Sequence, residues 1–257
     1  MGFVQANLGN LTKFNSATSS KLIDLYENAL DEQIVEESAR PRSQTFAPSS
    51  IRCPRISWFR LRGVQPDKVR KPDKMLNFTA VVGSACHEMI QEALSKKLGH
   101  DWIEVADHLE ELNPQYKYEV EKSGYETRVS IESPPIRFAV DGLLRLNDTK
   151  YLLEIKSSEY SSWSNLSDPK PHHVDQVKCY ASLLNLEHVL MIYIDRQYGD
   201  IKCFEITVSA EQRQQIWNMF QYVQNMVDAN LAPERLPTGD SWCNPSMCNY
   251  YEKCKQW

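Results

Sequence analysis

The sequence lacks the features that mark several classes of protein. Its 257 residues hold no apolar run approaching the ~20 residues that a membrane-spanning helix needs. The opening stretch, MGFVQANLGN, lacks the pattern of a secretory signal peptide, and no internal repeat is visible. With 42% hydrophobic and 25% charged residues, the composition suits one large globular domain, alone or with small appendages. We therefore expect a cytoplasmic protein that makes no contact with a membrane.

The chain also lacks an excess of positive charge, since its formal net charge is −5. Its basic residues are nevertheless concentrated: eight lie between Arg52 and Lys74, where only two acidic residues accompany them. Basic side chains interleaved with aromatic ones suit a phosphate backbone with stacked bases. A solvated basic loop is the alternative interpretation of the same pattern. The predicted DNA contacts are Arg52, Arg55, Trp58, Arg60 and Arg62.

The stretch IRFAVDGLLRLNDTKYLLEIK predicts a β-hairpin, because two apolar runs flank Asn147-Asp148, a dipeptide suited to a tight turn. If those two residues form the turn, Asp141 and Glu154 are cross-strand partners. Directly opposed residues have Cβ atoms about 4.5–5.5 Å apart and point to the same face. Lys156 lies on that face too, because the side chains of a strand alternate with a period of two.

Two carboxylates this close repel each other and raise each other's pKa unless a cation lies between them. Both lie within apolar runs, where a carboxylate without a partner is unfavourable. With the ammonium of Lys156 beside them, Asp141 and Glu154 therefore predict a site for a hard metal ion. The alternative is chance, since an acidic residue two places before a lysine is common and occurs again at Asp148 and Lys150.

Three more polar residues are candidates for the same site. His87, expected in a helix, could supply a third metal ligand, although a lone helical histidine is more often structural. Gln176 and Tyr180 are four residues apart in a predicted helix and so share a face. They could contact a phosphate or surround the lysine, or they could be a partly exposed polar pair.

The order Gly83-xxx-His87, Asp141-Gly142, Glu154-Ile155-Lys156 and Gln176-xxx-Tyr180 resembles the RecB-like branch of the PD-(D/E)xK nuclease superfamily. The resemblance covers residues 50–257, with Val140 in place of the proline in the superfamily name. It implies hydrolysis of phosphodiesters by a metal-activated water, with Mg²⁺ or Mn²⁺ neutralising the growing charge. The implied metal ligands are His87, Asp141, Glu154 and the carbonyl of Ile155; Lys156 would position or activate the water, and Gln176 and Tyr180 would support the site.

Seven cysteines, an odd number in a cytosolic chain, indicate thiols or metal ligands rather than disulfides. The AddB and Cas-four-type nucleases, which the chain resembles, hold a [4Fe–4S] cluster with one cysteine upstream of the nuclease core and three in the tail. Cys53 with Cys243, Cys248 and Cys254 matches that layout, except that four residues, where the family usually has two, separate the first tail pair.

Four thiolates also suit Zn²⁺, and reduced cysteines without a metal are a third possibility. A metal cluster would join the N-terminal segment to the tail and close a loop of about 200 residues. It would thereby fix the basic segment against the nuclease core. The other cysteines, Cys86, Cys179 and Cys203, lie inside apolar patterns and are expected in the core.

Strands with flanking helices predict an α/β or α+β protein, and the resemblance implies a central mixed sheet. The expected domains are an N-terminal helical segment with a linker (1–48), a nuclease core (49–230) and a cysteine-rich tail (231–257). The expected elements are a loose segment at 1–17, helices at 19–37, 83–99, 172–186 and 209–230, a linker at 39–50, two strands within 116–132, a mobile loop at 159–171, and strands at 188–195 and 201–208.

The sequence therefore predicts a metal-dependent DNA exonuclease that acts on single strands or duplex ends. The resemblance to Cas-four-type nucleases implies 5′→3′ polarity and a role in recombination, repair, CRISPR adaptation or phage DNA metabolism, in a bacterial, archaeal or phage-infected cell. With no helicase domain in the chain, a helicase or a recombination or CRISPR protein is an expected partner. The alternatives are a DNA-binding or assembly subunit that has lost cleavage, and a structure-specific endonuclease.

Overall fold

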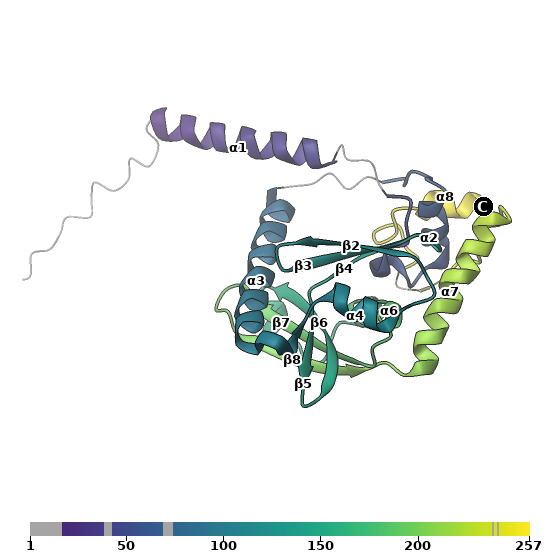
Figure 1. The fold of residues 1–257 in the computed structure, drawn as a ribbon. Coiled ribbons are helices and arrows are strands. Elements are labelled where there is room, and N and C mark those ends of the chain that lie inside the picture. The colour runs from purple at the N-terminus through teal and green to yellow at the C-terminus, as the bar shows by residue number, and fades with distance from the viewer. Residues whose placement is uncertain (1–16, 39–42, 69–73, 238, 241) are drawn as a thin grey trace, which may run out of the picture. The chain divides into compact units, whose positions relative to one another are not determined.

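The computed structural model has an α+β architecture, and Figure 1 shows its helices and strands. It describes residues 17–38, 43–68, 74–237, 239–240 and 242–257. The expected loose segment lies outside these residues except for Ala17, and the first four residues of the expected linker lie outside them too. Within the described residues, no helix has the length and apolar character to span a lipid bilayer.

The chain divides into two compact units. The smaller unit joins Met1–Pro41 with Arg70–Ala80, and the larger joins Arg42–Val69 with Val81–Trp257. The smaller unit contains helix α1 (Ala17–Ser38), close to the bounds predicted from the sequence. All of the candidate functional residues belong to the larger unit.

A mixed five-stranded sheet lies at the centre of the larger unit, as the resemblance implied. Its strands are β1 (Trp102–Ile103), β5 (Gly142–Leu146), β6 (Thr149–Ser158), β7 (His188–Asp195) and β8 (Ile201–Thr207). Their order in the sheet is β1-β5-β6-β7-β8. Strands β6 and β7 run parallel, whereas the other neighbouring pairs are antiparallel.

Helices cover both faces of this sheet. The helices that follow α1 are α2 (Pro54–Leu61), α3 (Lys74–Leu98), α4 (Val105–Leu112), α5 (Tyr160–Ser164), α6 (Pro171–Leu183), α7 (Ala210–Asp228) and α8 (Tyr251–Gln256). On one face, Leu153 and Ile155 of β6 pack with residues of α3, and on the other Leu152 packs with residues of α6 and α7. Because side chains alternate along a strand, Glu154 and Lys156 lie on the face that α6 covers.

The predicted hairpin register is confirmed from the turn as far as Gly142 and Leu153, but the predicted pairing of Asp141 with Glu154 does not form because β5 begins at Gly142. Strands β5 and β6 join at Asn147 and Asp148, whose φ angles of 49° and 64° belong to a tight hairpin turn. The antiparallel pairing starts next to this turn and ends with Gly142 opposite Leu153. The turn chemistry therefore set the register along the whole of β5.

The two strands predicted within 116–132 do not join the sheet of the hairpin. Strands β2 (Tyr118–Ser123), β3 (Glu126–Ile131) and β4 (Ile136–Val140) form a separate three-stranded sheet. The long strand expected before the turn is interrupted at Asp141, so β4 pairs with β3 while β5 pairs with β6 and β1. Asp141 thus lies where the chain passes from one sheet to the other.

The expected start of the second helix at Gly83 is also wrong, because α3 begins nine residues earlier, at Lys74. A Cβ on Gly83 would lie 3.1 Å from Oγ of Ser157, so this glycine allows the helix to approach the end of β6 closely. The helix ends at Leu98, and Gly99 follows with φ of 58°, as the sequence predicted.

Other predicted elements are confirmed close to their expected bounds, including β2, β3, α6, β7 and β8. A capping box begins α7: Gln212 N–H donates to Ser209 Oγ at 3.2 Å, and Ser209 N–H donates to Gln212 Oε1 at 3.0 Å. These elements depend on local signals, which explains why sequence reasoning located them.

The segment expected to be a loop at 159–171 contains the short helix α5. Its end is held by Lys202, whose Nζ donates to the backbone oxygens of Trp163 (2.9 Å) and Leu166 (2.9 Å). Sequence reasoning missed this arrangement because the ammonium comes from β8, far along the chain.

One of the three cysteines expected in the core is fully buried, namely Cys179. Cys86 is half-buried, and Cys203 is exposed, which contradicts the prediction for Cys203. The reason is topological: β8 is an edge strand, and its alternate side chains, including Cys203, face outward.

Candidate active site

The candidate site is built around Asp141, between the two sheets. Its Oδ2 accepts a hydrogen bond from Ile155 N–H at 2.7 Å, and its backbone oxygen accepts one from Gln91 Nε2 at 2.7 Å. The next residue must be small, because a Cβ on Gly142 would lie 2.5 Å from Cη2 of Trp102. The backbone is therefore fixed on both sides of the carboxylate.

The carboxylate of Asp141 occupies the place that β5 leaves open beside β6. The pairing of β6 with β5 ends at Leu153. Two residues later, Ile155 donates its N–H to Asp141 instead of to a strand on that side. The N–H and C=O of one residue in a strand point to the same side. The Ile155 carbonyl, one of the implied metal ligands, therefore lies on the same edge of β6 as Asp141.

Glu154 is buried, with 3% of its surface exposed, on the face of the sheet covered by α6. Burial and the nearby Asp141 carboxylate raise the pKa of Glu154 to about 7, although Lys156 opposes this shift. Lys156 Nζ lies 2.5 Å from Glu154 Oε1. The structure thus brings the two carboxylates and the lysine together, as the hairpin register predicted.

Helix α6 completes the surroundings of the lysine. Lys156 Nζ donates to Gln176 Oε1 at 3.0 Å, and Gln176 Nε2 donates to Tyr180 OH at 2.6 Å. Tyr180 stacks on Phe138 of β4, with ring centroids 5.5 Å apart. Gln176 and Tyr180 therefore share a face, as predicted, and they contact the lysine side of the site.

His87 reaches the site from α3. Its Nδ1 lies 3.2 Å from Asp141 Oδ1. Burial lowers the pKa of His87, but the hydrogen bond and charge of Asp141, with the charge of Glu154, outweigh burial and raise it. The histidine, the two carboxylates and the lysine thus form one coupled electrostatic group.

The donor set of this group fits a divalent cation. Carboxylate and carbonyl oxygens are the ligands that Mg²⁺ prefers, and an added imidazole nitrogen suits Mn²⁺ as well. A cation would also relieve the repulsion that raises the pKa of Glu154. In the described part of the chain, no three His, Cys, Asp or Glu side chains already stand at the mutual spacing of metal ligands.

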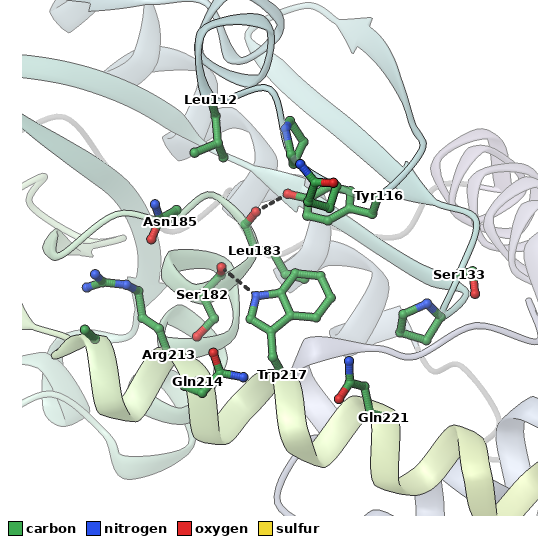
Figure 2. Close-up of a pocket in the computed structure, with 14 residues that line it drawn as sticks. Leu112, Tyr116, Ser133, Ser182, Leu183, Asn185, Arg213, Gln214, Trp217 and Gln221 are labelled. Carbon is green, nitrogen blue, oxygen red and sulfur yellow. Dashed lines mark hydrogen bonds between the residues drawn. The ribbon is translucent and has the colours of Figure 1, made fainter.

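A separate cavity of about 640 Å³ lies at the other end of α6, and Figure 2 shows its lining. None of the candidate catalytic residues lines it. Tyr116 donates to the backbone oxygen of Leu183, and Trp217 Nε1 donates to that of Ser182 at 3.1 Å. These bonds satisfy carbonyl groups at the end of α6, where a helix leaves them without helical partners. The cavity wall thus anchors the helix that carries Gln176.

The four cysteines proposed as cluster ligands line one cavity in the larger unit. Cys53 precedes α2, and Cys243, Cys248 and Cys254 come from the tail. Burial, with the neighbouring Cys248 and Cys254 thiols, raises the pKa of Cys53. Arg55 Nη1 lies 3.6 Å from Cys254 Sγ, so a guanidinium faces the group. Four thiols are the ligand type of a [4Fe–4S] cluster or Zn²⁺, although these four, like the other described side chains, do not stand at the mutual spacing of metal ligands.

Two of the predicted DNA contacts are not on the surface. Trp58 is fully buried, and its Nε1 donates to the backbone oxygen of Met226 at 3.2 Å. Arg55 is also buried and donates to the backbone oxygens of Pro233 (2.6 Å) and Cys254 (3.2 Å). Trp58 thus fastens α2 to α7 and Arg55 fastens it to the tail, so neither side chain is exposed for the DNA contact predicted from the sequence.

The other three predicted contacts are more accessible. Arg60 is half-buried, whereas Arg52 and Arg62 are exposed. The Arg52 guanidinium lies 5.7 Å from the ring centroid of Trp242, a half-buried aromatic that sequence reasoning missed. Its position next to the tail cysteines was the available signal. An accessible aromatic therefore does accompany the basic segment, but it comes from the tail.

Comparison with known proteins assigns no family to the chain. No family model matches it, and no curated protein resembles it in sequence. Similar solved structures include SSO0001 (TM-score 0.43, 15% identity, 83% of this chain and 98% of that one). Another is LHK-Exo in complex with dAMP (TM-score 0.45, 14% identity, 74% of this chain and 90% of that one). A third is LHK-Exo, an alkaline exonuclease from Laribacter hongkongensis (TM-score 0.39, 17% identity, 76% of this chain and 93% of that one). Likenesses this distant assign no activity, so the site itself carries the functional argument.

Replacing Gly142 by alanine is expected to destabilise the protein by about 1–3 kcal/mol, because the new methyl group overlaps the ring of Trp102. Urea denaturation of the variant measures this loss. Combining the change with Trp102→Leu makes room for the methyl group, so the double variant should lose less than the two single losses added together. Simple additivity would show that the two residues do not compete for space.

The stability of the metal-free protein should depend on the charge of Glu154. Its pKa is raised from 4.5 to about 7 in the folded state, so folding favours its protonated form. This stabilisation, on the order of a few kcal/mol, is fully present below the pKa that Glu154 has in the unfolded chain and is lost as pH rises through about 7. Glu154→Gln removes the titration, so urea unfolding with a chelator should show a smaller loss between about pH 5 and pH 8 in this variant. Parallel pH curves for the two proteins would contradict the assignment.

Proposed function

We propose that this protein is a metal-dependent nuclease that hydrolyses DNA phosphodiester bonds. One observation carries the proposal: Asp141 and Glu154 converge with Lys156 and His87 at the edge of β6 where β5 ends. Buried carboxylates that repel each other beside a lysine are costly for stability. Such an arrangement is typical of a functional site rather than of a structural core.

Each residue has a distinct task in this proposal. Asp141, Glu154, the Ile155 carbonyl and His87 would hold Mg²⁺ or Mn²⁺, which when bound polarises the phosphate and lowers the pKa of a bound water. Lys156 would place a compact positive charge beside the attacking water. Gln176 would hold the lysine, since its Oε1 accepts the Lys156 hydrogen bond, and Tyr180 would hold the glutamine.

The finer proposal is an exonuclease that acts on single-stranded DNA, with 5′→3′ polarity. The resemblance of the motifs to Cas-four-type nucleases supports it, and the exposed guanidinium of Arg62, 5.9 Å from the ring centroid of Trp257 in the tail, supports DNA binding. We also propose that Cys53 and the tail cysteines hold an iron–sulfur cluster, with Zn²⁺ as the alternative. The pathway would be recombination, repair, CRISPR adaptation or phage DNA metabolism, with a helicase or another protein as partner.

The test uses end-labelled linear and closed-circular single-stranded DNA with anaerobically purified protein and Mn²⁺ or Mg²⁺. Loss of the linear substrate alone would support an exonuclease, and the labelled end would give its polarity. Cut circles would instead establish an endonuclease. If DNA is bound but neither substrate is cut, the chain is a DNA-binding subunit and the nuclease proposal is wrong.

A further inference from the structure

A buried tyrosine connects β7 to the start of α6. Tyr193 is 1% exposed, and its hydroxyl oxygen accepts a hydrogen bond from the Lys170 backbone N–H at 3.0 Å. His173 Nδ1 lies 2.7 Å from the same oxygen, and the two ring centroids are 5.6 Å apart. The three residues therefore share one hydroxyl group at the first turn of α6.

The direction of the second bond follows from the donor inventory. Among the described residues, His173 Nδ1 is the one acceptor that lies at hydrogen-bond distance from the Tyr193 O–H. Leaving a buried hydroxyl hydrogen without an acceptor is costly, so Tyr193 donates to Nδ1. Burial, with the positive charge of Lys156, lowers the pKa of His173 to about 3 and keeps the ring neutral. The ring proton is therefore on Nε2.

His173 lies next to the candidate catalytic lysine. Tyr193 is the register partner of Lys156, so their side chains stand side by side on the same face of two adjacent strands. His173 precedes Gln176 by three residues and so shares its face of α6. No group among the described residues bonds His173 Nε2, so this N–H is free to donate.

We propose that His173 is a substrate-binding residue whose Nε2–H donates a hydrogen bond to a non-bridging oxygen of the DNA phosphate bound beside Lys156. This inference rests on the proposed nuclease function. A neutral donor with a fixed tautomer donates a directed hydrogen bond to the phosphate and does not accept a proton from the attacking water. Tyr193 is the positioning residue, because it holds Nδ1 and so fixes the proton on Nε2.

Two substitutions separate the two ring nitrogens. The side-chain amide of glutamine can place its nitrogen near the position of Nε2, whereas that of asparagine reaches only the position of Nδ1. If Nε2 binds the phosphate, His173→Gln keeps most of the wild-type kcat/KM. His173→Asn keeps the contact to Tyr193 but lowers kcat/KM about 10- to 100-fold, the loss expected for one hydrogen bond to a charged group. Thermal unfolding of both variants checks that their folds are equal.

A phosphorothioate substrate supplies a readout that a structural role would not change. Sulfur at the contacted non-bridging position accepts a hydrogen bond poorly, so it should slow the wild type more than it slows His173→Asn. Equal activity of the Gln and Asn variants, or an unchanged sulfur effect in His173→Asn, would overturn the inference while leaving the nuclease proposal intact. If the wild type cuts no DNA with Mn²⁺ or Mg²⁺, the nuclease proposal fails first and this inference fails with it.

Discussion

Replacing Glu154 by glutamine, or Lys156 by alanine, is expected to slow DNA cleavage about 1,000-fold or more, because the lost charge stabilisation is worth several kcal/mol in the transition state. Glutamine removes a metal ligand charge but keeps the shape of the protonated carboxyl group. That form is favoured by burial in the metal-free protein, so the fold should survive. The measurement is the single-turnover rate on end-labelled DNA with saturating Mn²⁺.

Glu187→Gln is the matched control, because it makes the same chemical change at an exposed side chain outside the site. It should cut DNA at the wild-type rate. Raising the metal concentration separates weak metal binding from lost chemistry in the Glu154 variant, since only the former recovers. Wild-type cleavage by either site variant would remove Glu154 and Lys156 from the mechanism.

If the four cysteines hold a metal, replacing Cys254 by serine is expected to release it and to lower the melting temperature by about 10 °C or more. A cluster that closes a loop of about 200 residues restricts the unfolded chain by about 5 kcal/mol, and each kcal/mol corresponds to about 2–4 °C in a chain of this size. Cys254 is buried and lines the cavity that Cys53 also lines. Elemental analysis, visible absorption and a thermal melt measure the three consequences.

Cys203→Ser is the control, because this thiol is exposed on the edge strand and does not line the cavity of the four cysteines. Iron with visible colour in the wild type would establish a cluster, and zinc without colour would establish the alternative metal. A colourless wild type without either metal, melting at the same temperature as the Cys254 variant, would show that the thiols are simply reduced.

Local signals account for the parts of the fold that the sequence predicted well. The turn at Asn147 and Asp148 determined the β5–β6 register, and the Ser209–Gln212 capping box located the start of α7. These signals act within a few residues, so no knowledge of distant contacts was needed. The convergence of the candidate catalytic residues followed from the same register.

Long-range contacts account for the failures. The sequence pattern of the basic segment is the same whether its aromatic residues face water or the core. Contacts with the tail determine which of the two occurs. Phe59 stacks on Tyr250 at 5.1 Å between ring centroids, and Arg55 bonds the backbone oxygen of Cys254. These partners lie about 190 to 200 residues further along the chain, where no periodicity within the segment can reveal them.

The candidate site shows both effects. Its carboxylates and lysine were predictable, but the break at Asp141 was not, because an apolar run gives no sign that it serves two sheets. His173 was missed although its spacing of three from Gln176 already indicated a shared helix face. Its proposed role depends on Tyr193, which the pairing of β6 with β7 brings beside Lys156. The sequence of neither strand predicts that pairing.

The bond between Asp141 and Ile155 N–H also satisfies a strand edge that β5 leaves unpaired. An unpaired strand edge is a template for pairing with another chain, and proteins protect such edges with charges or bulges. Where β5 ends, the Asp141 carboxylate both caps the free N–H of β6 and places a negative charge against any approaching strand. Asp141, proposed as a metal ligand, would thus also oppose self-association. Its replacement would leave this strand edge unpaired and would also remove the metal ligand.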